Sequence, residues 1–211
     1  MTNSLSQQIA KILLETKAVK LSPKAPFKWS SGWNSPIYCD NRVTLSFPTE
    51  RKVIKLALAE LIREKFPNVE AIAGVATAGI AQGALVAEEL NLPFLYVRPE
   101  PKKHGMKNCI EGAFSPNQKI VLIEDLISTG GSSIKAANNL IEAGARVLGI
   151  AATVTYGFAT ADDNFNKASI KLECISHYNH LIEEAVKMDY VSTEDVEVLK
   201  EWRLNPSEWS I

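Results

Sequence analysis

The stretch that most limits the fold of this chain is Val121–Ser133, which reads VLIEDLISTGGSS. Its apolar start is typical of a buried β-strand and ends in two adjacent carboxylates, Glu124 and Asp125. A turn of small residues follows, and a helical pattern of apolar residues begins at Ile134. The stretch therefore predicts a strand, a tight turn and a helix in direct succession.

The turn has the composition of a phosphate-binding loop. Glycine accepts left-handed backbone conformations and adds no side-chain bulk, so residues 128–133 can bring several backbone N–H groups to one anion. A helix that starts directly behind the turn adds the positive end of its dipole. The preceding carboxylates would repel a phosphate, so we expect them to face hydrogen-bond donors such as ribose hydroxyls or a hydrated cation. The alternative is an ordinary strand, turn and helix without a ligand.

The same stretch resembles the phosphoribosyl pyrophosphate signature of type I phosphoribosyltransferases. That resemblance implies that Glu124 and Asp125 hold the ribose hydroxyls and that Asp125 takes part in catalysis. It also implies that the following residues surround the 5′-phosphate, and that Ser128 contacts the base as well. The phosphoribosyl pyrophosphate-binding residues expected on this basis are Glu124, Asp125, Leu126, Ile127, Ser128, Thr129, Gly130, Gly131 and Ser132.

Length and composition fit one α/β domain. A chain of 211 residues with 46% hydrophobic residues can bury one core with a small appendage, so we expect a single domain over 1–211 whose residues 1–45 form a hood over the site. A net charge of -1 argues against nucleic acid or a membrane surface as partner. Three scattered cysteines and the absence of a signal-like or membrane-spanning apolar segment favour a cytoplasmic protein.

Residues 21–42 are rich in proline and aromatic residues and predict short extended pieces. One interpretation is a small hairpin that packs its aromatic side chains on the core. The other comes from resemblance to the N-terminal hood of orotate phosphoribosyltransferases, which implies closure over a pyrimidine. Ser30 stands where many relatives carry a lysine, and Tyr156 lies where some carry an arginine, while Arg42 is either a carboxylate partner or part of a structural ion pair. The residues that match the hood pattern are Phe27, Ser31, Gly32, Ser35, Pro36 and Tyr38.

Apolar periodicity places the remaining elements. A helix is expected at 5–16, capped by Ser4 and forming part of the lid. A second helix is expected after its cap Thr49, and a third is expected to end near Leu90. Two further helices are expected at 178–188 and 193–203. Strands are expected at 71–75, 93–97 and 147–154. This alternation predicts a doubly wound, mostly parallel sheet, the type I phosphoribosyltransferase fold, with the ligand at the carboxyl ends of the strands. Trp202 and Trp209 are expected to pack.

Two further motifs allow both a structural and a functional interpretation. The turn Ala76–Gly79 enters a helix and either only packs or contacts pyrophosphate through backbone amides, since Ala78 replaces a lysine found in some relatives. His177 and His180 could present two imidazoles to a metal, but no third ligand has a suitable spacing. We therefore favour a role for them at the start of a helix.

The second functional stretch is a basic loop that follows the strand at 93–97. The loop lacks apolar periodicity, and such a run is often only a solvated surface. Its five basic residues are Arg98, Lys102, Lys103, His104 and Lys107. Beside a phosphate cradle, however, a mobile basic loop can neutralise departing pyrophosphate and exclude water. The loop resembles that of orotate phosphoribosyltransferases, with Pro99 as a departure, which implies that Lys102, Lys103 and His104 are catalytic. These three and Arg98 are expected to bind phosphoribosyl pyrophosphate.

Taken together, the resemblance implies transfer of ribose 5-phosphate from phosphoribosyl pyrophosphate to orotate, giving orotidine 5′-monophosphate and pyrophosphate in pyrimidine synthesis. It also implies Mg²⁺ held through the substrate rather than by protein side chains, and a homodimer whose basic loop reaches the neighbouring subunit. Two alternatives remain at this point. A purine phosphoribosyltransferase shares the cradle, and a nucleotide-sensing regulator that binds nucleic acid shares the fold.

Overall fold

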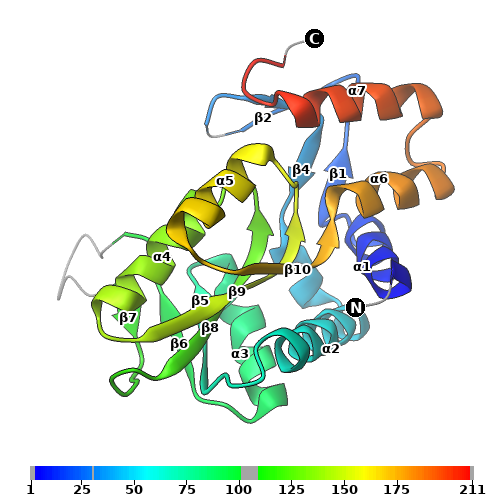
Figure 1. Cartoon of the computed structure of the whole chain (residues 1–211). Coiled ribbons are helices and arrows are strands. Elements are labelled where there is room, and N and C mark those ends of the chain that lie inside the picture. The colour runs from blue at the N-terminus through cyan, green and yellow to red at the C-terminus, as the bar shows by residue number, and fades with distance from the viewer. Residues whose placement is uncertain (1–2, 30, 101–108, 210–211) are drawn as a thin grey trace.

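The computed structural model describes residues 3–29, 31–100 and 109–209 (Figure 1). Its centre is a six-stranded sheet with the order β10-β9-β8-β5-β6-β7, in which only β7 is antiparallel to its neighbour. This confirms the predicted mostly parallel sheet. Its strands are β5 (Ala71–Val75), β6 (Phe94–Val97), β7 (Ile110–Glu111), β8 (Lys119–Ile127), β9 (Arg146–Thr155) and β10 (Leu172–His177).

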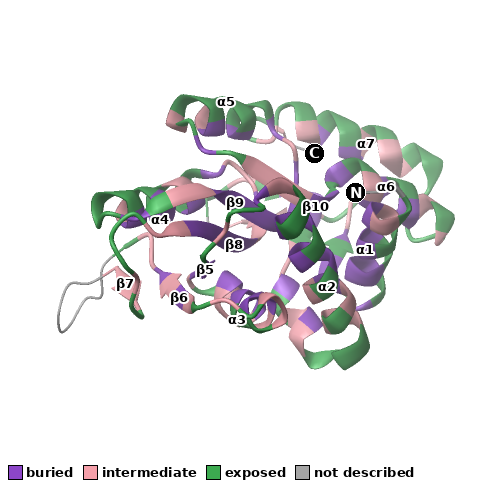
Figure 2. Ribbon diagram, turned by 60° about the horizontal axis from the view of Figure 1, so that its bottom comes forward, coloured by how far each residue is buried: buried purple, intermediate pink, exposed green. Residues whose placement is uncertain are grey.

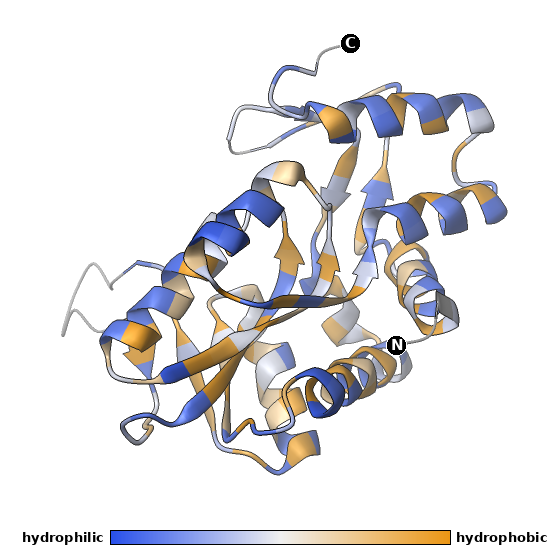
Figure 3. Ribbon diagram, in the orientation of Figure 1, coloured by the Kyte–Doolittle hydropathy of each residue, from blue (hydrophilic) through white to orange (hydrophobic). Residues whose placement is uncertain are grey.

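Two hydrophobic cores cover the two faces of the sheet, because successive residues of a strand point to opposite sides. In β8, Val121 and Ile123 belong to one core, whereas Ile120 and Leu122 belong to the other. Figure 2 shows the buried residues along the sheet, and Figure 3 shows that the central strands are largely hydrophobic. The first core includes α1 (Asn3–Glu15), α2 (Pro48–Lys65), α3 (Ala78–Leu90), α6 (Tyr178–Lys187) and α7 (Thr193–Leu204), and the second includes α4 (Gly131–Glu142) and α5 (Ala159–Ala168). Within the described ranges, none of these helices has the length and apolar character needed to cross a membrane.

The N-terminal segment forms two small antiparallel sheets. One pairs β1 (Val19–Leu21) with β4 (Ile37–Cys39), and the other pairs β2 (Phe27–Lys28) with β3 (Asn34–Ser35). A short 3-10 helix, η1 (Asn41–Ser46), leads into α2. These two hairpin sheets lie within residues 1–45, for which a hood over the site is expected, and are called the hood below. Helix α1 lies instead in the first core, where it packs against α6 and β10.

Several boundaries differ from the sequence-based expectations. Ser4 lies inside α1 and does not cap it, and Thr49 lies inside α2, which begins at Pro48 after the N-cap Phe47. Proline suits the first turn because its missing N–H would have no intrahelical partner there. Helix α4 begins at Gly131, before the apolar pattern that starts at Ile134. Strand β7, helix α5 and strand β10 were not predicted; β7 has only two residues, and α5 has few apolar positions.

Candidate active site

The turn between β8 and α4 has the backbone expected of an anion cradle. Gly130 is the N-cap of α4 with a φ of 80°, in the left-handed region that glycine tolerates. No side chain caps this helix, so the first amides of α4 are not occupied by a capping group. Asn164 donates a hydrogen bond of 2.9 Å from its Nδ2 to the Thr129 carbonyl, which fixes the turn from α5. The turn can therefore present amides to a phosphate.

The acidic pair is divided between two environments. Glu124 is buried, and its carboxylate accepts hydrogen bonds from Ser133 Oγ at 2.8 Å and from the Asp125 amide at 3.1 Å. Burial, reinforced by the neighbouring Asp125 carboxylate, raises the pKa of Glu124 to about 8. Burial also raises the pKa of Asp125. Asp125 is only half-buried and is the more accessible carboxylate of the two.

Asp125 sits where three segments meet. Asn41 donates from Nδ2 to the Asp125 carbonyl at 2.7 Å, which ties η1 to β8. A small cavity beside Asp125 is lined by Ala78 and Gln82 from α3, among other residues. The second small-residue turn therefore reaches the cavity beside Asp125 through Ala78, and its Ala76–Thr77 peptide is cis.

The hood and the cradle enclose one cavity of about 540 Å³. Trp29 forms its aromatic wall: its ring stacks on Tyr156 with centroids 5.6 Å apart at 17° and on Trp33 at 6.4 Å and 21°. The Trp29 indole also donates from Nε1 to the Ile37 carbonyl at 3.1 Å, which holds it against β4. The cavity is thus flat-sided and opens onto the cradle. Its lining residues are Lys28, Trp29, Ser31, Trp33, Tyr38, Cys39, Leu126, Ser128, Thr129 and Tyr156.

Lys28 is a functional candidate that the sequence analysis missed. Among the described residues that line the hood cavity, it alone has a charged side chain. The available signal was its place in the short strand β2, two residues before Ser30, the position where many relatives carry a lysine. Ser30 itself lies outside the described residues. Arg42, by contrast, forms a two-pronged ion pair with Asp40 at 2.6 and 2.8 Å, which favours its structural interpretation.

The base of the basic loop is attached to the cradle helix. Asn139 of α4 donates from Nδ2 to the Arg98 carbonyl at 2.8 Å, and Lys135 of α4 forms an ion pair with Glu100. The Arg98 guanidinium lies over the Tyr96 ring, 5.7 Å from its centroid. Of the predicted pyrophosphate ligands, Arg98 is therefore placed near the cradle helix. Lys102, Lys103 and His104 lie outside the described residues.

The histidine pair lies away from the cradle, at the junction of β10 and α6. His177 is the N-cap of α6, which agrees with the helix-entry role. No group of three or more His, Cys, Asp or Glu side chains in the described ranges could hold a metal ion. A cavity of about 920 Å³ between α6 and α7 contains none of the predicted site residues.

Comparison with known proteins places the chain in a family. The Phosphoribosyl transferase domain matches residues 46–190. The orotate phosphoribosyltransferase of Porphyromonas gingivalis is 56% identical over 208 residues, covering 99% of each chain, and that of Cytophaga hutchinsonii is 55% identical, covering 97% of this chain and 98% of the relative.

Solved structures show the same architecture. Orotate phosphoribosyltransferase from Aeropyrum pernix has a TM-score of 0.71 at 27% identity and covers 83% of this chain and 98% of its own. Leishmania donovani UMP synthase has a TM-score of 0.80 at 25% identity; the match covers 94% of this chain but 42% of that longer one. With a cradle, a hood and near full-length relatives in agreement, this chain belongs to the orotate phosphoribosyltransferase family.

Proposed function

We propose that this protein transfers the ribose 5-phosphate group of phosphoribosyl pyrophosphate to orotate in de novo pyrimidine synthesis. The observation that carries the proposal is the shared cavity: Ser128 and Thr129 of the cradle line the same space as Trp29 and Lys28 of the hood. A ribose 5-phosphate held by the cradle would thus have its reacting carbon beside a flat, aromatic-walled space suited to a pyrimidine.

The reaction exchanges one bond at the anomeric carbon. N1 of orotate bonds to C1′ of the ribose while the bond from C1′ to the pyrophosphate oxygen breaks, and that oxygen keeps the electron pair. The N1 proton of orotate is lost to the medium. Binding both substrates in adjoining spaces supplies orientation, so no covalent protein intermediate is required.

The cradle holds the phosphate end of the donor. Amides of residues 128–132 at the start of α4 bind the 5′-phosphate, with the helix dipole in their favour, and Leu126 and Ile127 form the approach to it. Asp125 accepts hydrogen bonds from the ribose hydroxyls, because it is the more accessible carboxylate. Glu124 acts from behind, where its hydrogen bond to Ser133 joins the strand to the cradle helix.

The hood provides recognition of the acceptor. The orotate ring lies against the Trp29 and Tyr156 wall, and Ser128 contacts the ring from the cradle side. Lys28 pairs with the orotate carboxylate, since it is the charged group of the described cavity lining and carries the opposite sign. Lys28 thereby takes the part that the absent lysine and arginine play in relatives.

The basic loop stabilises the leaving group. Arg98, Lys102, Lys103 and His104 neutralise the charge that develops on pyrophosphate as the bond breaks. Mg²⁺ carried in with the substrate would supply further charge neutralisation at the leaving group. The half-buried Asp125 carboxylate fits a hydrated cation carried in by the substrate, as an acceptor for its water ligands. The protein acts as a homodimer in which the basic loop of one subunit reaches the active site of the other. It acts in the cytoplasm.

A direct assay tests this function. Orotate absorbance should fall when phosphoribosyl pyrophosphate and Mg²⁺ are added to the protein, with orotidine 5′-monophosphate and pyrophosphate formed in equal amounts. Turnover of hypoxanthine in place of orotate would assign a purine enzyme instead. Tight nucleic-acid binding without pyrophosphate release would show that the protein is a nucleic-acid-binding regulator and not an enzyme.

A further inference from the structure

A second cavity shares Tyr156 with the hood cavity. Its volume is about 280 Å³. Gly157 contributes backbone from the end of β9, while His177 and His180 come from the start of α6 and Arg203 from α7. None of the residues assigned above to the donor or the acceptor, apart from the Tyr156 wall, belongs to this space.

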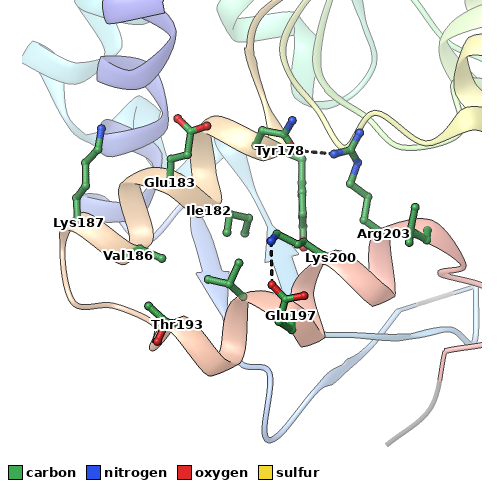
Figure 4. A pocket seen from close by; sticks show the side chains of 12 residues that line it. Tyr178, Ile182, Glu183, Val186, Lys187, Thr193, Glu197, Lys200 and Arg203 are labelled. Carbon is green, nitrogen blue, oxygen red and sulfur yellow. Dashed lines mark hydrogen bonds and ion pairs between the residues drawn. The ribbon is translucent and has the colours of Figure 1, made fainter.

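Arg203 brings a positive charge that no described carboxylate neutralises. Its Nη1 donates to Asn179 Oδ1 at 2.6 Å, and its Nη2 lies 3.4 Å from the Gly157 carbonyl; both acceptors are neutral. The guanidinium also lies over the Tyr178 ring, 5.8 Å from the centroid. Figure 4 shows Arg203 extending from α7 toward the start of α6. These contacts fix the guanidinium in place and leave its charge uncompensated within the described residues.

Two imidazoles add donors beside this guanidinium. The His177 and His180 ring centroids are 5.8 Å apart in an edge-on arrangement. His180 Nδ1 is buried and has no hydrogen-bond partner in the described part of the chain. Burial, then His180 and then Arg203, lower the pKa of His177, while Asp162 and Glu173 act weakly in the opposite direction. An unpartnered buried polar atom is costly, so a ligand that pairs with it would be stabilised there.

The backbone at the start of α6 also favours an anion. Helix α6 has ten residues, and its N-cap His177 makes no side-chain capping hydrogen bond. The first-turn amides and the positive end of the helix dipole therefore face the same end of α6 as the three side chains. One guanidinium, two imidazoles, one of which has an unpartnered nitrogen, and a helix start converge on one cavity.

From this arrangement we infer that the cavity formed by Gly157, His177, Asn179, His180 and Arg203 binds a phosphate-type oxyanion. An anion with two negative charges and several acceptor oxygens matches a guanidinium, two imidazoles and helix amides better than a carboxylate does. The ligand is either free inorganic phosphate or the phosphate of a nucleoside monophosphate. Because Tyr156 lines both cavities and stacks on Trp29, an anion here would be next to a residue of the hood cavity wall.

The three histidines of the chain allow a local test. Imidazole ¹⁵N signals of the intact protein are assigned with His177→Gln and His180→Gln, and His104 in the basic loop reports separately on the active site. Inorganic phosphate is titrated against chloride at constant ionic strength. We expect the His177 and His180 signals to move saturably toward their protonated positions, with half-saturation on the order of millimolar. Absence of a saturable shift at either histidine would overturn the inference.

Matched variants separate a specific site from general charge effects. Arg203→Gln should weaken the phosphate response by about tenfold or more, the loss expected for one charged hydrogen-bonding partner. Lys200→Gln is the control, because Lys200 is on the same helix but pairs with Glu197 at 2.9 Å (Figure 4). An equal response in Arg203→Gln and wild type would overturn the site. If Arg203→Gln does not fold, His180→Gln, read through the His177 signal, replaces it with the same expectation.

The source of the phosphate is distinguished by a second ligand. Adenosine 5′-monophosphate carries the same terminal group on a purine nucleoside that is not a substrate or product of the proposed reaction. A shift at His177 and His180 with this probe, abolished by Arg203→Gln, assigns the site to nucleotides. A shift with inorganic phosphate alone assigns it to the free ion. Orotate turnover is measured separately, so failure here leaves the proposed function unaffected.

Discussion

Ser133 Oγ donates a hydrogen bond of 2.8 Å to Glu124 Oε2, joining a buried position of strand β8 to the first turn of α4. The two residues are nine positions apart and lie on either side of the proposed phosphate cradle. The buried carboxylate therefore holds the strand and the helix in the relative position that the cradle needs.

This relationship predicts a pH-dependent stability. The folded-state pKa of Glu124, about 8, lies above its ordinary value of 4.5, so between these values the folded chain binds more protons than the unfolded chain. The free energy of unfolding should therefore fall as pH rises through this window. In Glu124→Gln, the free energy of unfolding should fall less over the same pH window, as measured by urea unfolding. Identical pH profiles for both proteins would contradict the assignment. Ser133→Ala, which removes a donor to the carboxylate, should extend the loss to higher pH.

Replacing the hood cation should affect orotate and leave the donor unaffected. Lys28→Met removes a charge-assisted contact of about 1.5–3 kcal/mol. We expect kcat/KM for orotate to fall by about 10- to 100-fold, with the KM for phosphoribosyl pyrophosphate unchanged. Lys20→Met, at an exposed position of β1, is the matched control. Uracil, which lacks the carboxylate, should be used equally poorly by wild type and Lys28→Met; a further loss with uracil would show that Lys28 acts otherwise.

The basic loop should be essential for the chemical step. Lys102→Ala is expected to cut kcat by orders of magnitude, because the charge on departing pyrophosphate loses a neutralising partner. Circular dichroism should show the same folded content as wild type. Lys11→Ala, in an exposed pair with Glu15 on α1, serves as the control. Near-normal turnover of Lys102→Ala would remove this lysine from the mechanism.

The cradle turn should tolerate no side chain at its left-handed glycine. A Cβ at Gly130 would lie 2.5 Å from Cε2 of Phe165, at a φ of 80°. Gly130→Ala should lower the free energy of unfolding by about 1–3 kcal/mol or more. Gly144→Ala isolates the backbone part, since Gly144 has a φ of 93° with open space around it. Equal losses in both variants would show that the Phe165 contact relaxes without cost.

The C-terminal helix should stabilise the hood. Trp202 is fully buried, and its Nε1 donates to the Asn34 carbonyl of β3 at 3.2 Å. Trp202→Phe removes this bond and part of the packing, so we expect a loss of about 1–3 kcal/mol in unfolding free energy and a higher KM for orotate. Trp209→Phe, half-buried and nearer the chain end, should change both by much less. An unchanged KM for orotate in Trp202→Phe would limit this residue to stability.

Some elements could be predicted because their signals are local. The apolar strands at 71–75, 93–97 and 147–154, the final helices and the turn with Gly130 all appear where periodicity and glycine chemistry place them. Helix α5 and strand β10 were missed, since α5 shows few apolar positions and β10 mixes polar with apolar residues. Short amphipathic segments of this kind are defined by their neighbours rather than by their own pattern.

The sequence by itself determined the strand, turn and helix of the cradle, the alternating α/β order and the family. Only the tertiary structure decided that Glu124 is buried against Ser133, that Trp202 bonds to the Asn34 carbonyl, and that Lys28 shares a cavity with Ser128. The physical reason is range. Backbone conformation and apolar periodicity depend on residues a few positions apart, whereas burial, ion pairing and cavity lining depend on residues brought together from distant parts of the chain.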